Sequence, residues 1–110
     1  MRHRKGLSDE DRGARSRLHR LLARADGLIH GSLIRMARTC GKAGCRCARK
    51  GQKHASWYLG QSVKGQARMK HIPKHMEPAV RQWVAAYQSA RSLLEEMSRQ
   101  AWRRLERKEE

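Results

Sequence analysis

The chain has 110 residues, of which 38% are hydrophobic and 33% are charged, and 26 Lys and Arg against 10 Asp and Glu give a formal net charge of +16. This length favours one small domain, and no stretch approaches the roughly 18 apolar residues that a membrane-spanning helix needs. So basic a chain is attracted to polyanions, which makes nucleic acid the expected partner and an anionic membrane surface its competitor.

The N-terminal segment 1–7 is predicted to be a flexible basic arm. No apolar run follows it, so no secretory signal is expected, and we predict a cytoplasmic protein, with association with the nucleoid as a more specific hypothesis. The cysteine count is 3, an odd number that argues against a closed set of disulfides.

Residues 8–110 are predicted to form a single domain that begins with a helix over residues 8–30. Ser8 is a suitable N-cap, and acids follow it in the first turn, where they favour the helix N-terminus. Apolar residues from Leu18 to Ile29 recur at steps of three and four, which is typical of one buried helical face. The helix is expected to end near His30 and Gly31.

Residues 31–76 are predicted to form a basic β-rich head. Strands are expected over 32–38, 55–59 and 67–72, with a turn over 61–65, because these segments are rich in β-branched and aromatic residues or alternate in polarity. Arg68 and Lys70 are expected to share one face of the last strand.

A long helix is predicted over residues 77–107. Its apolar residues from Val80 to Leu105 follow near-heptad spacing. The predicted fold is therefore α+β, with a helical hairpin or coiled-coil stem formed by the two helices and the head inserted between them. The second helix is longer than the first, so its surplus apolar surface predicts a homodimer through the helices.

All three cysteines fall within eight positions. Cys40, Cys45 and Cys47, followed by His54, give a Cys-x4-Cys-x-Cys-x6-His spacing, and Cys3His is a ligand set of structural Zn²⁺ sites. The alternatives are three reduced cysteines with a solvent-exposed histidine, a redox-active cysteine, or His71, His75 or His30 as the fourth ligand. The predicted cofactor is a structural Zn²⁺, and because such a site is closed it predicts no catalysis.

No carboxylate occurs between Asp26 and Glu77. Ordinary solvated surfaces mix both signs of charge, so this interval predicts a surface that faces an anion. The eleven cations expected to contact nucleic acid are Arg35, Arg38, Lys42, Arg46, Arg49, Lys50, Lys53, Lys64, Arg68, Lys70 and Lys74.

Trp57 and Tyr58 permit two interpretations, as members of a small core or as platforms on which an unpaired base stacks. The sequence contains no phosphate-binding loop, no nucleophile elbow and no set of catalytic carboxylates. We therefore predict that the protein is not an enzyme.

The run Arg-Thr-Cys-Gly-Lys-Ala-Gly-Cys-Arg-Cys at residues 38–47 resembles an uncharacterised bacterial family of short basic proteins. The similarity extends over residues 28–100 through Gly-Ser-Leu-Ile at 31–34 and Ile-Pro-Lys at 72–74. Ala55-Ser56 departs from the Gly-Pro expected there. The resemblance implies an association with mobile elements and therefore a role on DNA.

Two functions remain in competition. The first is an accessory protein that binds nucleic acid, with DNA ahead of RNA. The second is an interaction adaptor or regulatory subunit that docks on an acidic protein partner. Competition by duplex DNA separates the two.

Overall fold

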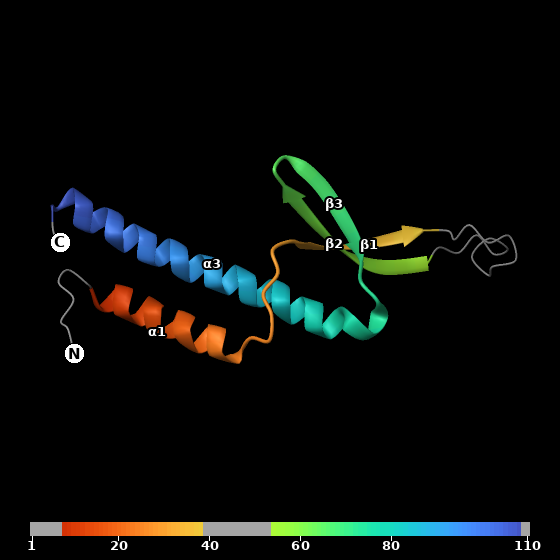
Figure 1. Ribbon diagram of the computed structural model, residues 1–110, viewed down its shortest axis with the longest axis horizontal. Helices are drawn as coiled ribbons and strands as arrows, with labels where there is room; N and C mark the ends of the chain where they lie inside the picture. Colours follow the sequence, from red (N-terminus) through yellow and green to blue (C-terminus); the bar gives the residue numbers. More distant parts are fainter. Residues whose placement is uncertain (1–7, 39–53, 109–110) are drawn as a thin grey trace, which may run out of the picture. The chain divides into compact units, whose positions relative to one another are not determined.

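The computed structural model describes residues 8–38 and 54–108. The elements follow the order α1 (Asp9–Arg24), β1 (Ser32–Arg38), β2 (His54–Val63), β3 (Gln66–His71), the 3-10 helix η1 (Lys74–Met76) and α3 (Glu77–Glu106), as Figure 1 shows. The predicted α+β class is confirmed, with a three-stranded antiparallel sheet between two helices in the chain order. Two compact units result, a helical unit (Met1–Leu28 with Ala85–Glu110) and a sheet unit (Ile29–Val84).

Helix α1 begins where the sequence predicts and ends earlier than predicted. The Ser8 Oγ accepts a hydrogen bond from the Asp11 N–H at 3.1 Å, and three acids occupy the first turn. At the other end Ala25 is extended, so the helix stops after Arg24 and not at residue 30. The apolar spacing continues to Ile29, but Ile29 belongs to the sheet unit, where its N–H donates to the Trp83 carbonyl.

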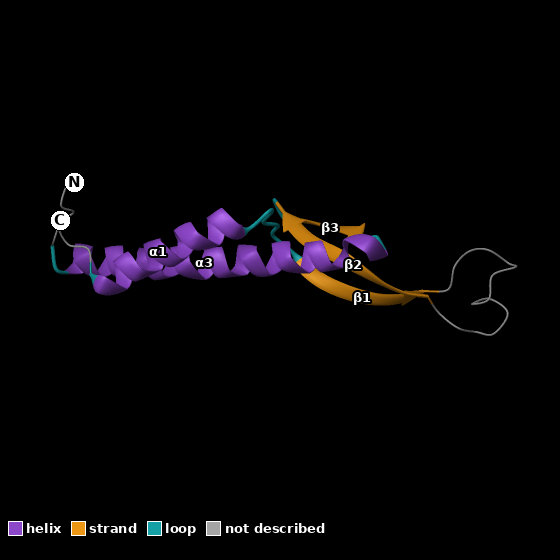
Figure 2. Ribbon diagram, turned by 90° about the horizontal axis from the view of Figure 1, so that it is seen from below, coloured by secondary structure: helices purple, strands orange, loops and turns teal. Residues whose placement is uncertain are grey.

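In the helical unit α1 lies antiparallel to the later part of α3 (Figures 1 and 2). Ser8, at the start of α1, donates from Oγ to the Gln100 Oε1 at 3.1 Å, whereas Arg17 lies beside the stretch from Ala85 to Leu93. The buried residues Ala14 and Ala90 have small side chains, which suits helices that approach closely.

In the sheet unit the strands follow the order β1-β2-β3, with Leu33 opposite Leu59 and Leu59 opposite Lys70. Ile72, Val80 and Val84 form the buried core of this unit. The half-buried residues that pack against this core come from the chain before β1, from β1, β2 and η1, and from the first turns of α3; they are Ile29, Leu33, Trp57, Leu59, Met76 and Trp83.

The β2–β3 hairpin closes through Lys64 and Gly65. Both residues have positive φ, 52° and 78°, which is the signature of a two-residue type I′ turn. The turn is tighter than the predicted turn over 61–65, so β2 continues to Val63.

Helix α3 serves both units. Its first turns carry Val80 and Val84 into the sheet core, and its later part lies beside α1. The apolar stripe predicted as one helical seam thus has two successive packing partners. The coiled-coil stem as such stays a prediction.

Candidate nucleic-acid interface

Charge is divided unequally between the two units. The sheet unit contains 12 Lys and Arg and a single carboxylate, that of Glu77, whereas the helical unit contains 14 Lys and Arg and 9 Asp and Glu. The sheet unit therefore carries +11 of the formal +16. Any polyanion that approaches the chain meets the stronger local field at the sheet unit.

The ion pairs of Lys and Arg in the described part of the chain lie in the helical unit. They include the pairs of Arg15 with Asp11, Arg91 with Glu95, and Arg99 with Glu96. In the described part of the sheet unit no Lys or Arg forms an ion pair, because the single carboxylate present does not reach one. Its cations are available to an external anion.

Three of the predicted cations share one face of the sheet. Residues directly opposite each other in an antiparallel sheet point to the same side, and Arg35 is opposite Trp57, Arg68 opposite Gln61, and Lys70 opposite Leu59. The prediction that Arg68 and Lys70 share a face is confirmed by this register. Arg35, Arg68 and Lys70 are all exposed, as are Lys64 at the hairpin turn and Lys74 in η1.

Gln61, which no sequence pattern marks as a site residue, orients one of these cations. The Gln61 Nε2 donates to the His30 carbonyl at 2.7 Å, and the Gln61 Oε1 accepts from the Arg68 Nε at 2.8 Å. The Arg68 guanidinium is therefore held at one end and exposed at the other. The sequence assigned Gln61 to a turn, and only the longer β2 brings it opposite Arg68.

Trp57 and Tyr58 point to opposite faces of β2. Trp57 packs against the core, and the Arg81 guanidinium carbon lies 4.4 Å from its ring centroid, a cation–π geometry. The Tyr58 ring meets the ring of His71 edge-on, with 5.3 Å between centroids. The two aromatic residues therefore cannot serve one base-stacking surface: Trp57 lies on the face of Arg35, Arg68 and Lys70, and Tyr58 lies on the opposite face.

Arg81 is a further exposed cation of the sheet unit. The absence of acids does not point to Arg81, because Arg81 lies beyond Glu77, outside the acid-free interval. Its position four residues after Glu77 on α3 gave no local signal, and only its packing over Trp57 identifies it as part of this unit.

Several predicted site residues lie outside the described residues. They are Cys40, Cys45, Cys47, Lys42, Arg46, Arg49, Lys50 and Lys53. His54 is the first residue of β2 and Arg38, the last of β1, is its register partner. Among residues 8–38 and 54–108 no three His, Cys, Asp or Glu side chains gather as a metal site, which leaves the predicted zinc site untested.

One carboxylate in the helical unit has a perturbed acidity. Hydrogen bonds from the Arg99 side chain, and then from Gln100, hold the pKa of Glu96 below its usual value. Gln100 also accepts from Ser8, so Glu96 is linked through Gln100 to the start of α1. This network belongs to the packing of the two helices and not to the basic surface.

No helix in the described ranges is long and apolar enough to cross a membrane. A comparison with curated proteins and with solved structures found no detectable similarity to either. A family model does match residues 10–82, a range that includes almost all of α1, all three strands and the start of α3. The matched range is well over half of the chain, and the chain therefore belongs to the family of the domain of unknown function DUF6788.

Proposed function

We propose that the protein binds nucleic acid through the basic surface of its sheet unit, as an accessory protein and without turnover. The observation that carries this proposal is the single carboxylate among the 13 Lys, Arg, Asp and Glu residues of that unit. Cations that so outnumber the carboxylates repel one another, and a phosphate backbone relieves this repulsion. Counterion release then supplies much of the binding free energy.

Duplex DNA is the favoured ligand and RNA the alternative. Arg35, Arg68 and Lys70 are proposed as phosphate contacts. Because the Gln61 hydrogen bond already restricts the Arg68 side chain, Arg68 loses less conformational entropy when it binds a phosphate. Fluorescence anisotropy with labelled duplex DNA and RNA over a range of salt concentrations tests the proposal. Steeply salt-dependent binding is expected, whereas no binding of either ligand at low salt would contradict it.

We also propose a structural Zn²⁺ bound by Cys40, Cys45, Cys47 and His54. The support is the register of the first two strands. His54 stands opposite Arg38, so the pairing of β1 with β2 anchors both ends of the segment that contains the cysteines. Elemental analysis of protein purified without chelators is expected to find about one zinc per chain. Protein free of transition metal would exclude the site.

The second candidate function is docking to a protein through the helical unit, either to a second copy or to an acidic partner. It is favoured by Leu94, Trp102 and Leu105, which are 55%, 65% and 66% exposed. Large apolar residues exposed together on one helix are typical of an interaction surface. Light scattering is expected to give a dimer for the wild type and a monomer for Trp102→Ala. A monomer at every wild-type concentration would exclude self-association.

A further inference from the structure

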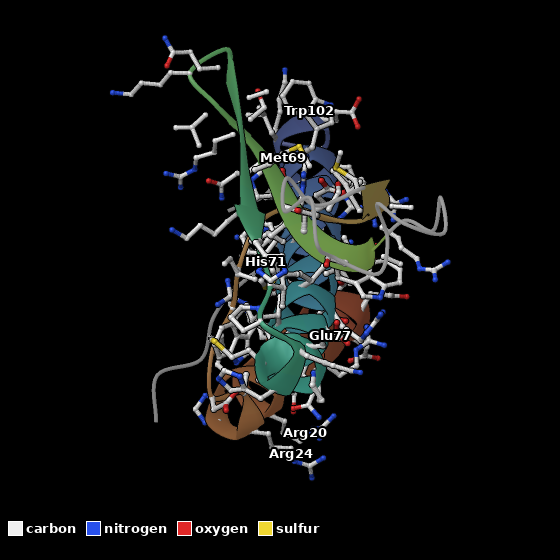
Figure 3. The ribbon with its side chains drawn as sticks, turned by 90° about the vertical axis from the view of Figure 1, so that its right-hand side faces the viewer. Arg20, Arg24, Met69, His71, Glu77 and Trp102 are labelled. Atoms are coloured by element: carbon white, nitrogen blue, oxygen red, sulfur yellow. The ribbon has the colours of Figure 1, made fainter. Side chains whose placement is uncertain are left out.

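The outer face of α1 carries four exposed arginines. At 100° per residue Arg12, Arg17, Arg20 and Arg24 project from one side of the helix, and the small residues Gly13, Ser16 and Ala23 lie among them. We call this set the α1 arginine face. Figure 3 shows Arg20 and Arg24 extending away from the helix. The opposite side is the packed one, with Asp11 and Ala14 buried.

The arginines of this face form no ion pair in the described structure, although the exposed Asp9 projects from the same side one turn before Arg12. The only ion pair that α1 makes there is Arg15 with Asp11, and Arg15 is not a member of the face. Arg17, Arg20 and Arg24 stand three and four residues apart, a spacing at which like charges repel along a helix. A row of cations that repel one another is complementary to a polyanion.

Gly13 gives a second, independent indication. Glycine is unfavourable inside a helix, yet a Cβ built at Gly13 would meet nothing within 4 Å. No neighbour in the described fold therefore requires a glycine here. What the missing side chain does allow is close approach of another molecule to the helix backbone.

A shallow groove borders the same face. It has a volume of ≈ 450 Å³ and is lined by Arg17, Ala85, Gln88, Ser89, Ser92 and Leu93. Hydroxyl, amide and guanidinium groups are the side-chain donors that bind phosphate oxygens in nucleic-acid complexes. Arg17 belongs both to the groove and to the α1 arginine face, so the groove adjoins the face at this residue.

We infer that the α1 arginine face and this groove form a second contact surface, which binds the backbone of a duplex with α1 lying in or along the major groove. The inference rests on the proposed function and extends it to the ligand class. The three arginines from Arg17 to Arg24 span about 10 Å of helix axis, and a major groove about 12 Å wide admits a helix. A rigid row of guanidinium groups suits the regular phosphates of a duplex better than a flexible single strand.

The test uses the full chain and a short labelled duplex. One variant replaces Arg17, Arg20 and Arg24 by Gln, and it is expected to lower the salt slope by about 0.9 for each phosphate that the variant no longer neutralises. The other variant is Gly13→Gln, which leaves the charge unchanged. It is expected to raise the melting temperature and yet to weaken binding, because the new side chain obstructs the close approach.

Ala101→Gln adds a side chain at an exposed position of α3 outside this face and serves as the matched control. Because Ala101 lies four residues before Leu105, light scattering first checks that its oligomeric state is that of the wild type, and wild-type binding is then expected. Wild-type affinity in the arginine variant, beside weaker binding by a variant of the sheet cations, overturns the inference and leaves the proposed function standing. Weaker binding by the arginine variant with wild-type binding by Gly13→Gln indicates attraction at a distance and also overturns it. Failure of the wild-type chain to bind any duplex overturns the proposed function itself.

Discussion

Replacement of the cations on β3 and at the turn before it tests where nucleic acid binds. The variant changes Lys64, Arg68 and Lys70 to Gln, three exposed cations at the β2–β3 turn and on β3. Removing one cation that neutralises a phosphate lowers the slope of log affinity against log salt by about 0.9, so removing three lowers it by about 2.7. Between 50 and 200 mM salt the affinity ratio of wild type to variant is then expected to fall by about 40-fold, from the same relation.

The matched control changes Arg91, Arg99 and Arg103 to Gln on α3. It lowers the net charge by the same amount, but Arg91 and Arg99 already form ion pairs with Glu95 and Glu96. We expect a small decrease in affinity and a nearly unchanged slope. Fluorescence anisotropy measures both quantities, and circular dichroism confirms matched folding. Equal decreases in the two variants would refute the location of the site at the sheet, because they would mean that only net charge matters.

Three further predictions concern the stability of the fold. Ile72→Ala leaves a cavity in the sheet core and is expected to lower the free energy of unfolding by about 2–5 kcal/mol in urea titrations; a decrease below about 1 kcal/mol would contradict a core at this position. Lys64→Asn, at a positive φ of 52°, is expected to stabilise the hairpin by up to about 1 kcal/mol while it weakens nucleic-acid binding, and a lower melting temperature would speak against the type I′ turn. Because the pKa of Glu96 is lower in the folded protein, ionised Glu96 stabilises the fold at pH values above its unfolded pKa of 4.5, and this stabilisation is lost as the pH falls through the folded pKa. Glu96→Gln should remove that part of the pH dependence of the unfolding free energy. An unchanged pH dependence in the variant would exclude a stabilising role of this carboxylate.

The elements that periodicity predicts are largely those observed. Alternation and β-branched content located all three strands, and the long helix begins at Glu77 as predicted. The N-terminal helix was predicted too long because Leu28 and Ile29 continue its apolar spacing. Ile29 packs against the sheet core and Leu28 is exposed, so apolar spacing showed neither which element covers a residue nor that both residues are covered.

Only part of the candidate site could be predicted from the sequence. The absence of acids identified the basic segment, and the pleat of a strand identified the shared face of Arg68 and Lys70. Gln61 and Arg81 act through partners remote in sequence, His30 and Trp57, so no local pattern indicates them. Likewise, sequence alone does not show which of Trp57 and Tyr58 packs in the core, because this depends on how β2 pairs with its neighbouring strands.

Helix α3 has a consequence for how this chain can be divided. Its first turns complete the core around Ile72, and its later turns form the wall against which α1 packs. A cut in the first turns of α3 therefore removes helix from the sheet unit. A cut after Val84 leaves that unit with only two helical turns, which are too short to be stable by themselves in water. A chain cut at this junction is therefore expected to fold into neither unit, so both units depend on one unbroken α3.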